Sequence, residues 1–330
     1  MRAVKNLLVL YTGGTIGMLE TPQGLAPAGG FEARMRDYLA TQSQSPGIAW
    51  HMRELSPLLD SANMQQANWL SMRDAIVEAV KQDGHDAILV LHGTDTLAYS
   101  AAALSFLLLG LDVPVLLTGS MLPAGAPDSD AWNNLCGALR LFETGIDNGV
   151  HLYFAGQLLH GARASKLRSE AFDAFAALPR LREGQRAGQI PAVLTYCQPR
   201  TPVNLAVLPV FPGLQAAHVR ALIDSGVKGL LLECYGSGTG PSDDETLLQV
   251  LADARRRGVL VVAISQCPQG SVMFDTYAAG SRLRDAGLVS AGGMTREAAL
   301  AKLFALLGAG LDAATAQHWF TLDLCGERVQ

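Results

Sequence analysis

Short, unbroken apolar runs alternate along this chain with longer segments in which apolar residues recur every three or four positions. Runs of this length without strict alternation are typical of strands covered on both faces, as in a parallel sheet. The three-to-four spacing indicates amphipathic helices. The N-terminal half predicts strands at 7–12, before 60, 86–91, 113–118 and 150–154, and helices at 31–40, 69–80 and 97–108. This βαβαβ order predicts a doubly wound α/β fold with a mostly parallel sheet.

The periodicity disappears between about 182 and 202, where Gly, Gln, Pro and Arg dominate, and this composition indicates a linker. A second α/β unit follows, with strands expected at 205–211, 228–233 and 259–264 and a last helical pair from Thr295. We therefore expect a larger N-terminal domain at 1–185, a linker at 186–203, and a smaller C-terminal domain with a parallel sheet at 204–330.

Three of the predicted N-terminal strands end in turns that combine glycine with threonine or serine. These turns are Thr12-Gly13-Gly14-Thr15, His92-Gly93-Thr94-Asp95-Thr96 and Thr118-Gly119-Ser120. Open α/β sheets bind their ligands at the carboxyl ends of the strands. The hydroxyls are therefore expected to line one crevice. The segment 21–30, rich in Pro and Gly, is either a lid over the first turn or a plain surface loop.

The composition and motif content of the chain argue against several classes of function. The 330 residues carry a formal charge of −5, which argues against nucleic-acid and anionic-membrane partners. Five scattered cysteines without a CxxC pair suggest buried reduced thiols, and the histidines lack metal-ligand spacing. Neither a P-loop nor a GxGxxG motif occurs, so no cofactor is expected. The apolar run before the first glycine turn is too short for a signal peptide, and the cytoplasm is the expected compartment.

With metal and cofactor sites unsupported, the candidate chemistry is nucleophilic catalysis by a hydroxyl group. A threonine becomes nucleophilic only when a base removes its proton and a third group orients that base. His92, Lys166 and Asp95 are the candidate bases, although a histidine closing a strand is more often a satisfied structural group. Lys166 is expected in a polar loop at 161–169, where it is either a solvated charge or a desolvated base. The residues alone leave these alternatives open.

Two motifs, Tyr11-Thr12-Gly13-Gly14-Thr15-Ile16-Gly17-Met18 and His92-Gly93-Thr94-Asp95-Thr96, resemble the signatures of bacterial-type L-asparaginases. The first is closer to the cytoplasmic type I branch than to the periplasmic type II branch. Further matching segments occur in the family's order: Asp60-Ser61, Thr118-Gly119-Ser120, Ser165-Lys166, Phe172-Asp173-Ala174-Phe175, Tyr235-Gly236 and Gln266-Cys267. The resemblance therefore covers essentially the whole chain.

The resemblance implies a reaction and a set of roles. Thr15 would attack the side-chain amide of L-asparagine, releasing ammonia, and water would then release L-aspartate. Thr94, Lys166 and Asp95 would relay the proton, and backbone amides of the first turn and Thr94 would stabilise the oxyanion. Substrate-binding positions would be Gly14, Asp60, Ser61, Ala62, Gly93, Thr94, Asp95 and Thr239. The resemblance also implies a homodimer or homotetramer with sites between subunits, and no metal.

Two positions depart from the family pattern. Leu25 occupies the place of a lid tyrosine that hydrogen-bonds the nucleophile, and Thr239 replaces an asparagine contributed across the dimer. Four hypotheses are therefore weighed: an L-asparaginase, an amidase or glutaminase of shifted specificity, a weakly active aspartate- or asparagine-binding homologue, and the amidase subunit of a tRNA amidotransferase. The last is disfavoured because its additional N-terminal domain has no counterpart before residue 11.

Overall fold

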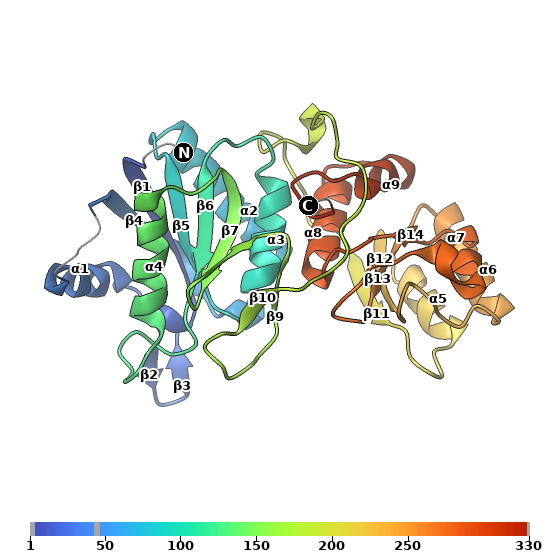
Figure 1. Cartoon of the computed structure of the whole chain (residues 1–330), viewed down its shortest axis with the longest axis horizontal. Helices are drawn as coiled ribbons and strands as arrows, with labels where there is room; N and C mark the ends of the chain where they lie inside the picture. Colours follow the sequence, from blue (N-terminus) through green and yellow to red (C-terminus); the bar gives the residue numbers. More distant parts are fainter. Residues whose placement is uncertain (1–3, 43–46, 329–330) are drawn as a thin grey trace. The chain divides into compact units, whose positions relative to one another are not determined.

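The computed structural model describes residues 4–42 and 47–328, and it divides the chain into two compact units, Met1–Ala177 and Leu178–Gln330. The predicted linker at 186–203 therefore falls inside the second unit. Each unit is built around a sheet of parallel or mostly parallel strands with helices on both faces (Figure 1).

The first unit contains a six-stranded sheet in the order β4-β1-β5-β6-β7-β8. Its strands are β1 (Asn6–Gly13), β4 (Ala49–Leu59), β5 (Ala87–Leu91), β6 (Pro114–Thr118), β7 (Gly149–Phe154) and β8 (Gln157–His160). All pairings are parallel except that of β8, which returns antiparallel to β7. The doubly wound, mostly parallel sheet predicted from the apolar runs is confirmed.

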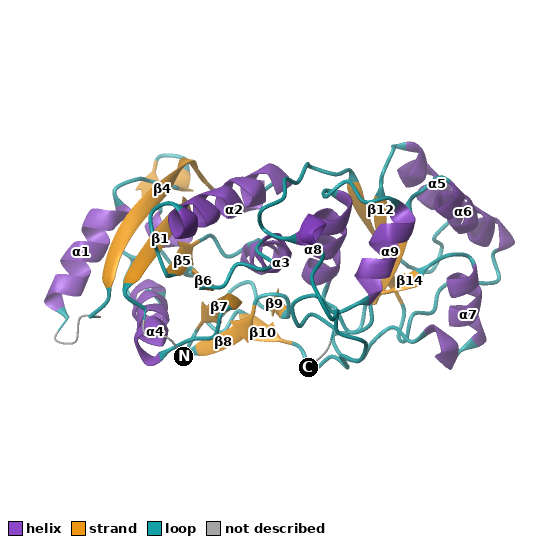
Figure 2. Cartoon of the chain, turned by 90° about the horizontal axis from the view of Figure 1, so that it is seen from above, coloured by secondary structure: helices purple, strands orange, loops and turns teal. Residues whose placement is uncertain are grey.

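The faces of this sheet follow the alternation of side chains along β1. Leu7, Val9 and Tyr11 pack with α1 (Phe31–Thr41) and α4 (Ala131–Thr144) in one core. Leu8 and Leu10 are also buried, and their side chains point to the opposite face. There lie α2 (Gln66–Lys81) and α3 (Leu97–Leu107), on the other side of the strands from α4 (Figure 2). Burial on both faces explains why the strands are unbroken apolar runs.

The second unit carries a four-stranded parallel sheet, in the order β11-β12-β13-β14. Its strands are β11 (Leu205–Pro209), β12 (Gly229–Cys234), β13 (Leu260–Ser265) and β14 (Val289–Ser290). Its helices are α5 (Ala216–Asp224), α6 (Glu245–Arg256), α7 (Ala278–Asp285), α8 (Arg296–Leu307) and α9 (Ala313–Thr321). The predicted parallel C-terminal sheet is confirmed. Helices α4 and α7 were not predicted from the sequence.

Two hairpins lie where loops were expected. The segment 21–30 contains most of a short hairpin, β2 (Leu19–Thr21) with β3 (Gly24–Ala26), whose residues are mostly exposed. Lys166 is the last residue of β9 (Ala164–Lys166), which pairs antiparallel with β10 (Phe175–Ala177). The placement of Lys166 in a loop was therefore wrong. Both hairpins are too short to show a period in the sequence.

None of the five cysteines, all within the described residues, forms a disulfide, but only part of the burial expectation holds. Cys234 is fully buried in β12, whereas Cys197 and Cys267 are exposed. The expectation of buried thiols was wrong for these two.

Candidate active site

The turn after β1 presents Thr15 at the carboxyl edge of the first sheet. Gly13 and Gly14 have φ angles of +109° and +85°, a region that other residues rarely adopt. The Gly14 amide donates a hydrogen bond to the Leu59 carbonyl at 3.0 Å, which joins this turn to the end of β4. Thr15 then opens a short 3₁₀ turn, η1 (Thr15–Gly17), and is partly exposed. Within the described residues its hydroxyl has no hydrogen-bond partner, so it is available to a ligand.

Three turns that lie far apart in the sequence touch at this edge. A Cβ on Gly14 would stand 2.2 Å from the Gly93 amide nitrogen, and a Cβ on Gly93 would stand 2.5 Å from the Ser61 Oγ. Both distances are well inside van der Waals contact, so only glycine fits at either position. The glycines of the two signature motifs thus bring the Thr15, Thr94 and Ser61 turns together.

A lysine reaches this junction from the β9–β10 hairpin. The Lys166 Nζ donates hydrogen bonds to the Thr94 Oγ1 at 3.0 Å and to the Asp95 Oδ1 at 2.8 Å. Thr94 is 6% exposed, while the Lys166 side chain is 20% exposed and that of Asp95 59%. The three groups form a hydroxyl–amine–carboxylate chain, the arrangement in which an amine can take a proton from a hydroxyl while a carboxylate orients it.

The proposed substrate-binding residues Asp60, Ser61 and Ala62 lie in the turn after β4. This turn includes η2 (Ser61–Asn63), and the Asp60 carboxylate accepts a hydrogen bond from the Ala62 amide at 3.2 Å. The Ser61 Oγ accepts one from the Asp95 amide at 3.3 Å. Asp60 therefore caps this turn, and its carboxylate retains oxygen lone pairs for a ligand.

Thr239 is the one sequence-predicted site residue outside the first unit. It closes a tight turn after β12, where its amide donates to the Tyr235 carbonyl at 3.0 Å and its carbonyl accepts from the Tyr235 amide at 2.9 Å. Its side chain is partly exposed.

Three hydroxyls expected in the crevice are committed to the backbone instead. Thr12 donates to the Leu91 carbonyl at 2.9 Å, Thr118 to the Tyr153 carbonyl at 2.7 Å and Ser120 to the Leu122 carbonyl at 2.5 Å. All three residues are at most 2% exposed. The expectation that every turn hydroxyl lines one rim was therefore wrong, because a buried hydroxyl must find a partner within the protein.

His92 is a structural group and not a base at this site. Its Nδ1 donates to the Gly93 carbonyl at 2.7 Å, and its Nε2 accepts from the Ser100 hydroxyl at 2.9 Å. Ser100 in turn accepts from the Trp69 Nε1 at 3.0 Å. Complete burial lowers the pKa of His92 from 6.5 to about 4, so the imidazole stays neutral at physiological pH. Of the three candidate bases, the geometry favours Lys166.

The segment joining η1 to α1 is anchored at both ends. The Arg34 guanidinium donates to the Gly17 carbonyl at 2.8 Å, and the Tyr11 hydroxyl donates to the Ala28 carbonyl at 3.1 Å. Between these points the β2–β3 hairpin carries Leu25, which is 49% exposed. Tyr11 does not replace the absent tyrosine, because its hydroxyl is already bonded and burial raises its pKa to about 12. The Arg34 contact could not be predicted from the sequence, because an arginine in an amphipathic helix gives no sign of a backbone partner.

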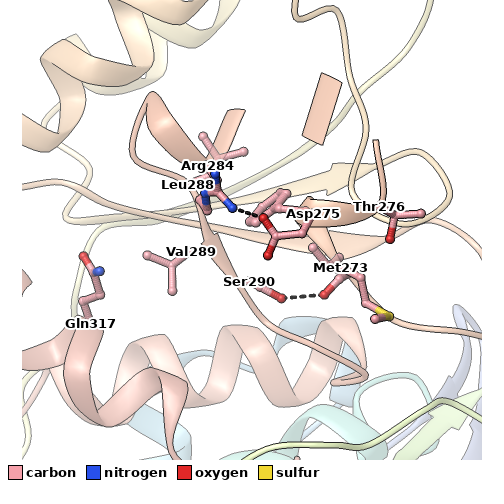
Figure 3. A pocket seen from close by; sticks show the side chains of 10 residues that line it. Met273, Asp275, Thr276, Arg284, Leu288, Val289, Ser290 and Gln317 are labelled. Atoms are coloured by element: carbon pink, nitrogen blue, oxygen red, sulfur yellow. Dashed lines mark hydrogen bonds and ion pairs between the residues drawn. The ribbon is translucent and has the colours of Figure 1, made fainter. Parts of the chain in front are cut away.

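Other kinds of site have less support. The described residues contain no group of histidine, cysteine or acidic side chains able to hold a metal, and none of the described helices is long and apolar enough to cross a membrane. A separate cavity of about 600 Å³ lies in the second unit among Phe274, Arg284, Ser290 and Gln317 (Figure 3). There the Arg284 guanidinium pairs with Asp275 and the Ser290 hydroxyl bonds to the Val272 carbonyl, so these two polar groups already have partners.

An unbonded threonine beside a Thr–Lys–Asp chain is the arrangement expected of enzymes that transfer an acyl group through a hydroxyl nucleophile. Comparison with known proteins narrows this class. Residues 6–190 match the family model "Asparaginase, N-terminal", and residues 204–320 match "Glutaminase/Asparaginase C-terminal domain". The chain belongs to the asparaginase family.

Relatives match along nearly the whole chain. L-asparaginase 1 of Escherichia coli K12 is 37% identical over 333 residues, covering 98% of both proteins. The solved structure of L-asparaginase I from Vibrio cholerae has a TM-score of 0.83 at 34% identity and covers 99% of this chain and 100% of that one. The thermostable L-asparaginase of Thermococcus kodakarensis gives a TM-score of 0.84 at 32% identity, covering 98% and 99%. The resemblance inferred from the motifs is confirmed at the level of family and fold.

Proposed function

We propose that this protein hydrolyses L-asparagine to L-aspartate and ammonia through an acyl-enzyme on Thr15. The observation that carries the proposal is the pair of Lys166 hydrogen bonds, to the Thr94 hydroxyl and to the Asp95 carboxylate, at the point where the Gly14 and Gly93 turns touch. No metal or cofactor is required, because the nucleophile, a base and an orienting carboxylate are all supplied by the chain.

The reaction proceeds in two halves. The Thr15 Oγ1 attacks the side-chain amide carbon and transfers its proton to the Thr94–Lys166 chain. The C–N bond then breaks, and the nitrogen leaves as ammonia after taking a proton back. Water attacks the resulting ester, its proton passes to the same chain, and the Thr15 oxygen is released with its proton restored. Backbone amides of the first turn and Thr94 stabilise the oxyanion in both halves, a contribution of about 3 kcal/mol for one such donor.

Recognition of the amino acid falls to the two neighbouring turns. Asp60 and Asp95 offer carboxylates to the substrate's α-ammonium group, and Ser61 and the backbone of Gly14, Ala62 and Gly93 surround its α-carboxylate. The motif resemblance supports a homodimer or homotetramer in which Thr239 reaches the site of a second copy. It also supports a cytoplasmic location and domain limits of 1–185 and 204–330 around a linker.

The test is ammonia release from purified protein with L-asparagine and L-glutamine compared side by side. We expect turnover of L-asparagine, and a loss of at least about 10³-fold in kcat for Thr15→Ala. The circular dichroism and melting temperature of the variant should match the wild type, since Thr15 is partly exposed and unbonded.

Three results would count against the proposal. Full activity in Thr15→Ala would move the nucleophile elsewhere, with Thr94 the next candidate. Preference for L-glutamine would shift the substrate while leaving the chemistry intact, and tight binding of L-aspartate without turnover of either amide would indicate a binding protein.

A further inference from the structure

Thr96 occupies an N-cap position without capping its helix. It directly precedes α3, where a threonine hydroxyl ordinarily accepts a hydrogen bond from an amide in the first turn, worth about 1 kcal/mol. Thr295 does this for α8, accepting from the Ala298 amide at 3.1 Å. The Thr96 hydroxyl makes no such bond. It donates instead to the Ser61 carbonyl, 35 residues away in the sequence, at 2.8 Å.

A second bond runs in parallel with the first. The Asp95 amide donates to the Ser61 Oγ at 3.3 Å, so Ser61 is bound through both its carbonyl and its side chain. Ser61 is 3% exposed, and its Cβ lies where a side chain on Gly93 would stand, at 2.7 Å. Thr96 and Asp95 together therefore fix the distance between the turn at 60–63 and the turn at 93–96.

We infer that Thr96 is a positioning residue that holds the amino-acid-binding turn, Asp60 to Ala62, in register with the Thr94–Asp95–Lys166 chain. The inference rests on the proposed function, since it assigns substrate recognition to the first turn and proton transfer to the second. Thr96 acts on the substrate only through Ser61. Loss of its hydroxyl leaves both Lys166 hydrogen bonds in place, so binding should weaken more than the chemical step.

The experiment compares Thr96→Val, Thr96→Ser and Thr295→Val with the wild type. For each protein, KM and kcat with L-asparagine and the Kd of L-aspartate by calorimetry are measured, together with the melting temperature. Valine has the shape of threonine without the hydroxyl, and serine keeps the hydroxyl. Thr295→Val is the matched control, because it removes the hydroxyl of an N-cap threonine that does cap its own helix.

We expect Thr96→Val to raise KM and the Kd of L-aspartate about fivefold, the effect of one lost hydrogen bond, with kcat within about twofold. Thr96→Ser should stay close to wild type. Thr295→Val should lower the melting temperature and leave KM and Kd unchanged. This pattern separates positioning from a general loss of stability.

Three results would overturn the inference: unchanged KM and Kd in Thr96→Val, equal losses in Thr96→Val and Thr295→Val, or no rescue by serine. If the wild type binds L-aspartate but does not hydrolyse L-asparagine, the proposed function fails and the Kd series still decides the role of Thr96. A wild type that neither binds nor hydrolyses rejects both.

Discussion

Two lysines of this protein each bind a carboxylate, in surroundings that differ sharply. Lys166 pairs with Asp95 at 2.8 Å, and the two side chains are 20% and 59% exposed. Lys302, on α8, pairs with Glu327, and both side chains are completely buried. Lys302 also donates to the Leu322 carbonyl, while Glu327 accepts from the amides of Leu324 and Cys325 at 3.0 and 2.8 Å.

The two pairs differ in the partners of their other hydrogen-bond donors and acceptors. In the Lys302–Glu327 pair these groups bond to the backbone of the C-terminal segment, so the pair holds that segment to α8. The Lys166–Asp95 pair has a threonine hydroxyl as its third member and solvent access for a substrate. Burial lowers the pKa of Lys302, and its complete burial keeps a substrate away from the pair. A fully buried ion pair has a structural role, whereas a partly exposed pair can take part in a reaction.

Replacing Lys166 should produce the largest effect. Lys166→Met removes the base while keeping a long side chain, and we expect kcat to fall by about 10²- to 10⁴-fold. The melting temperature should change little, because a partly exposed pair contributes about 0–1 kcal/mol. Ammonia release measures the fall in kcat, and calorimetry measures the melting temperature. An active Lys166→Met variant would require another base.

Replacing Lys302 should show the reverse pattern. Lys302→Met leaves Glu327 buried without its cation, and we expect a loss of about 3–5 kcal/mol in the free energy of unfolding. Urea denaturation measures it, with kcat retained in the folded fraction. Adding Glu327→Gln should recover part of the loss, since glutamine is uncharged. Equal stability of the single variant and the wild type would show that the pair does not hold the C-terminal segment.

Acid titration distinguishes the role of His92 from that of the neighbouring groups proposed to be catalytic. The folded-state pKa of about 4 lies below the ordinary value of 6.5, so the unfolded chain binds the proton more readily. Stability is therefore complete above pH 6.5 and falls as the pH drops from 6.5 towards 4, by about 3 kcal/mol. Unfolding free energies measured at intervals from pH 7 to 4 should show this loss, and His92→Gln should show a shallower dependence. A kcat profile that follows the same titration would contradict a purely structural imidazole.

The sequence was most informative where burial on two faces leaves a periodic pattern. The strands of both parallel sheets and helices such as α2 fall close to the predicted positions, because packing dictates which residues they can contain. The glycines at 14 and 93 were also informative, since a close backbone approach tolerates no other residue. The β2–β3 and β9–β10 hairpins were missed because three-residue strands are too short to show alternation.

The candidate site was harder to predict than the sheets. Lys166 and Thr94 are 72 positions apart, and no periodic pattern in the sequence links the β9–β10 hairpin that carries the amine to the turn that carries the hydroxyl. A turn motif likewise does not reveal where a hydroxyl points. Thr12 and Thr15 stand three residues apart in one motif, yet the Thr12 hydroxyl bonds to the Leu91 carbonyl, whereas the Thr15 hydroxyl has no partner among the described residues. Their separate roles depend on neighbours that the local sequence does not specify.

The contact between Gly14 and Gly93 has a practical consequence for altering specificity by mutagenesis. A side chain at either position would push the two backbones apart and disturb both motifs at once. A combinatorial library should therefore keep both glycines constant and diversify the exposed positions Ala62 and Asn63, where new side chains can project into solvent. Such a library would sample different substrate preferences while the contact between Gly14 and Gly93 stays intact.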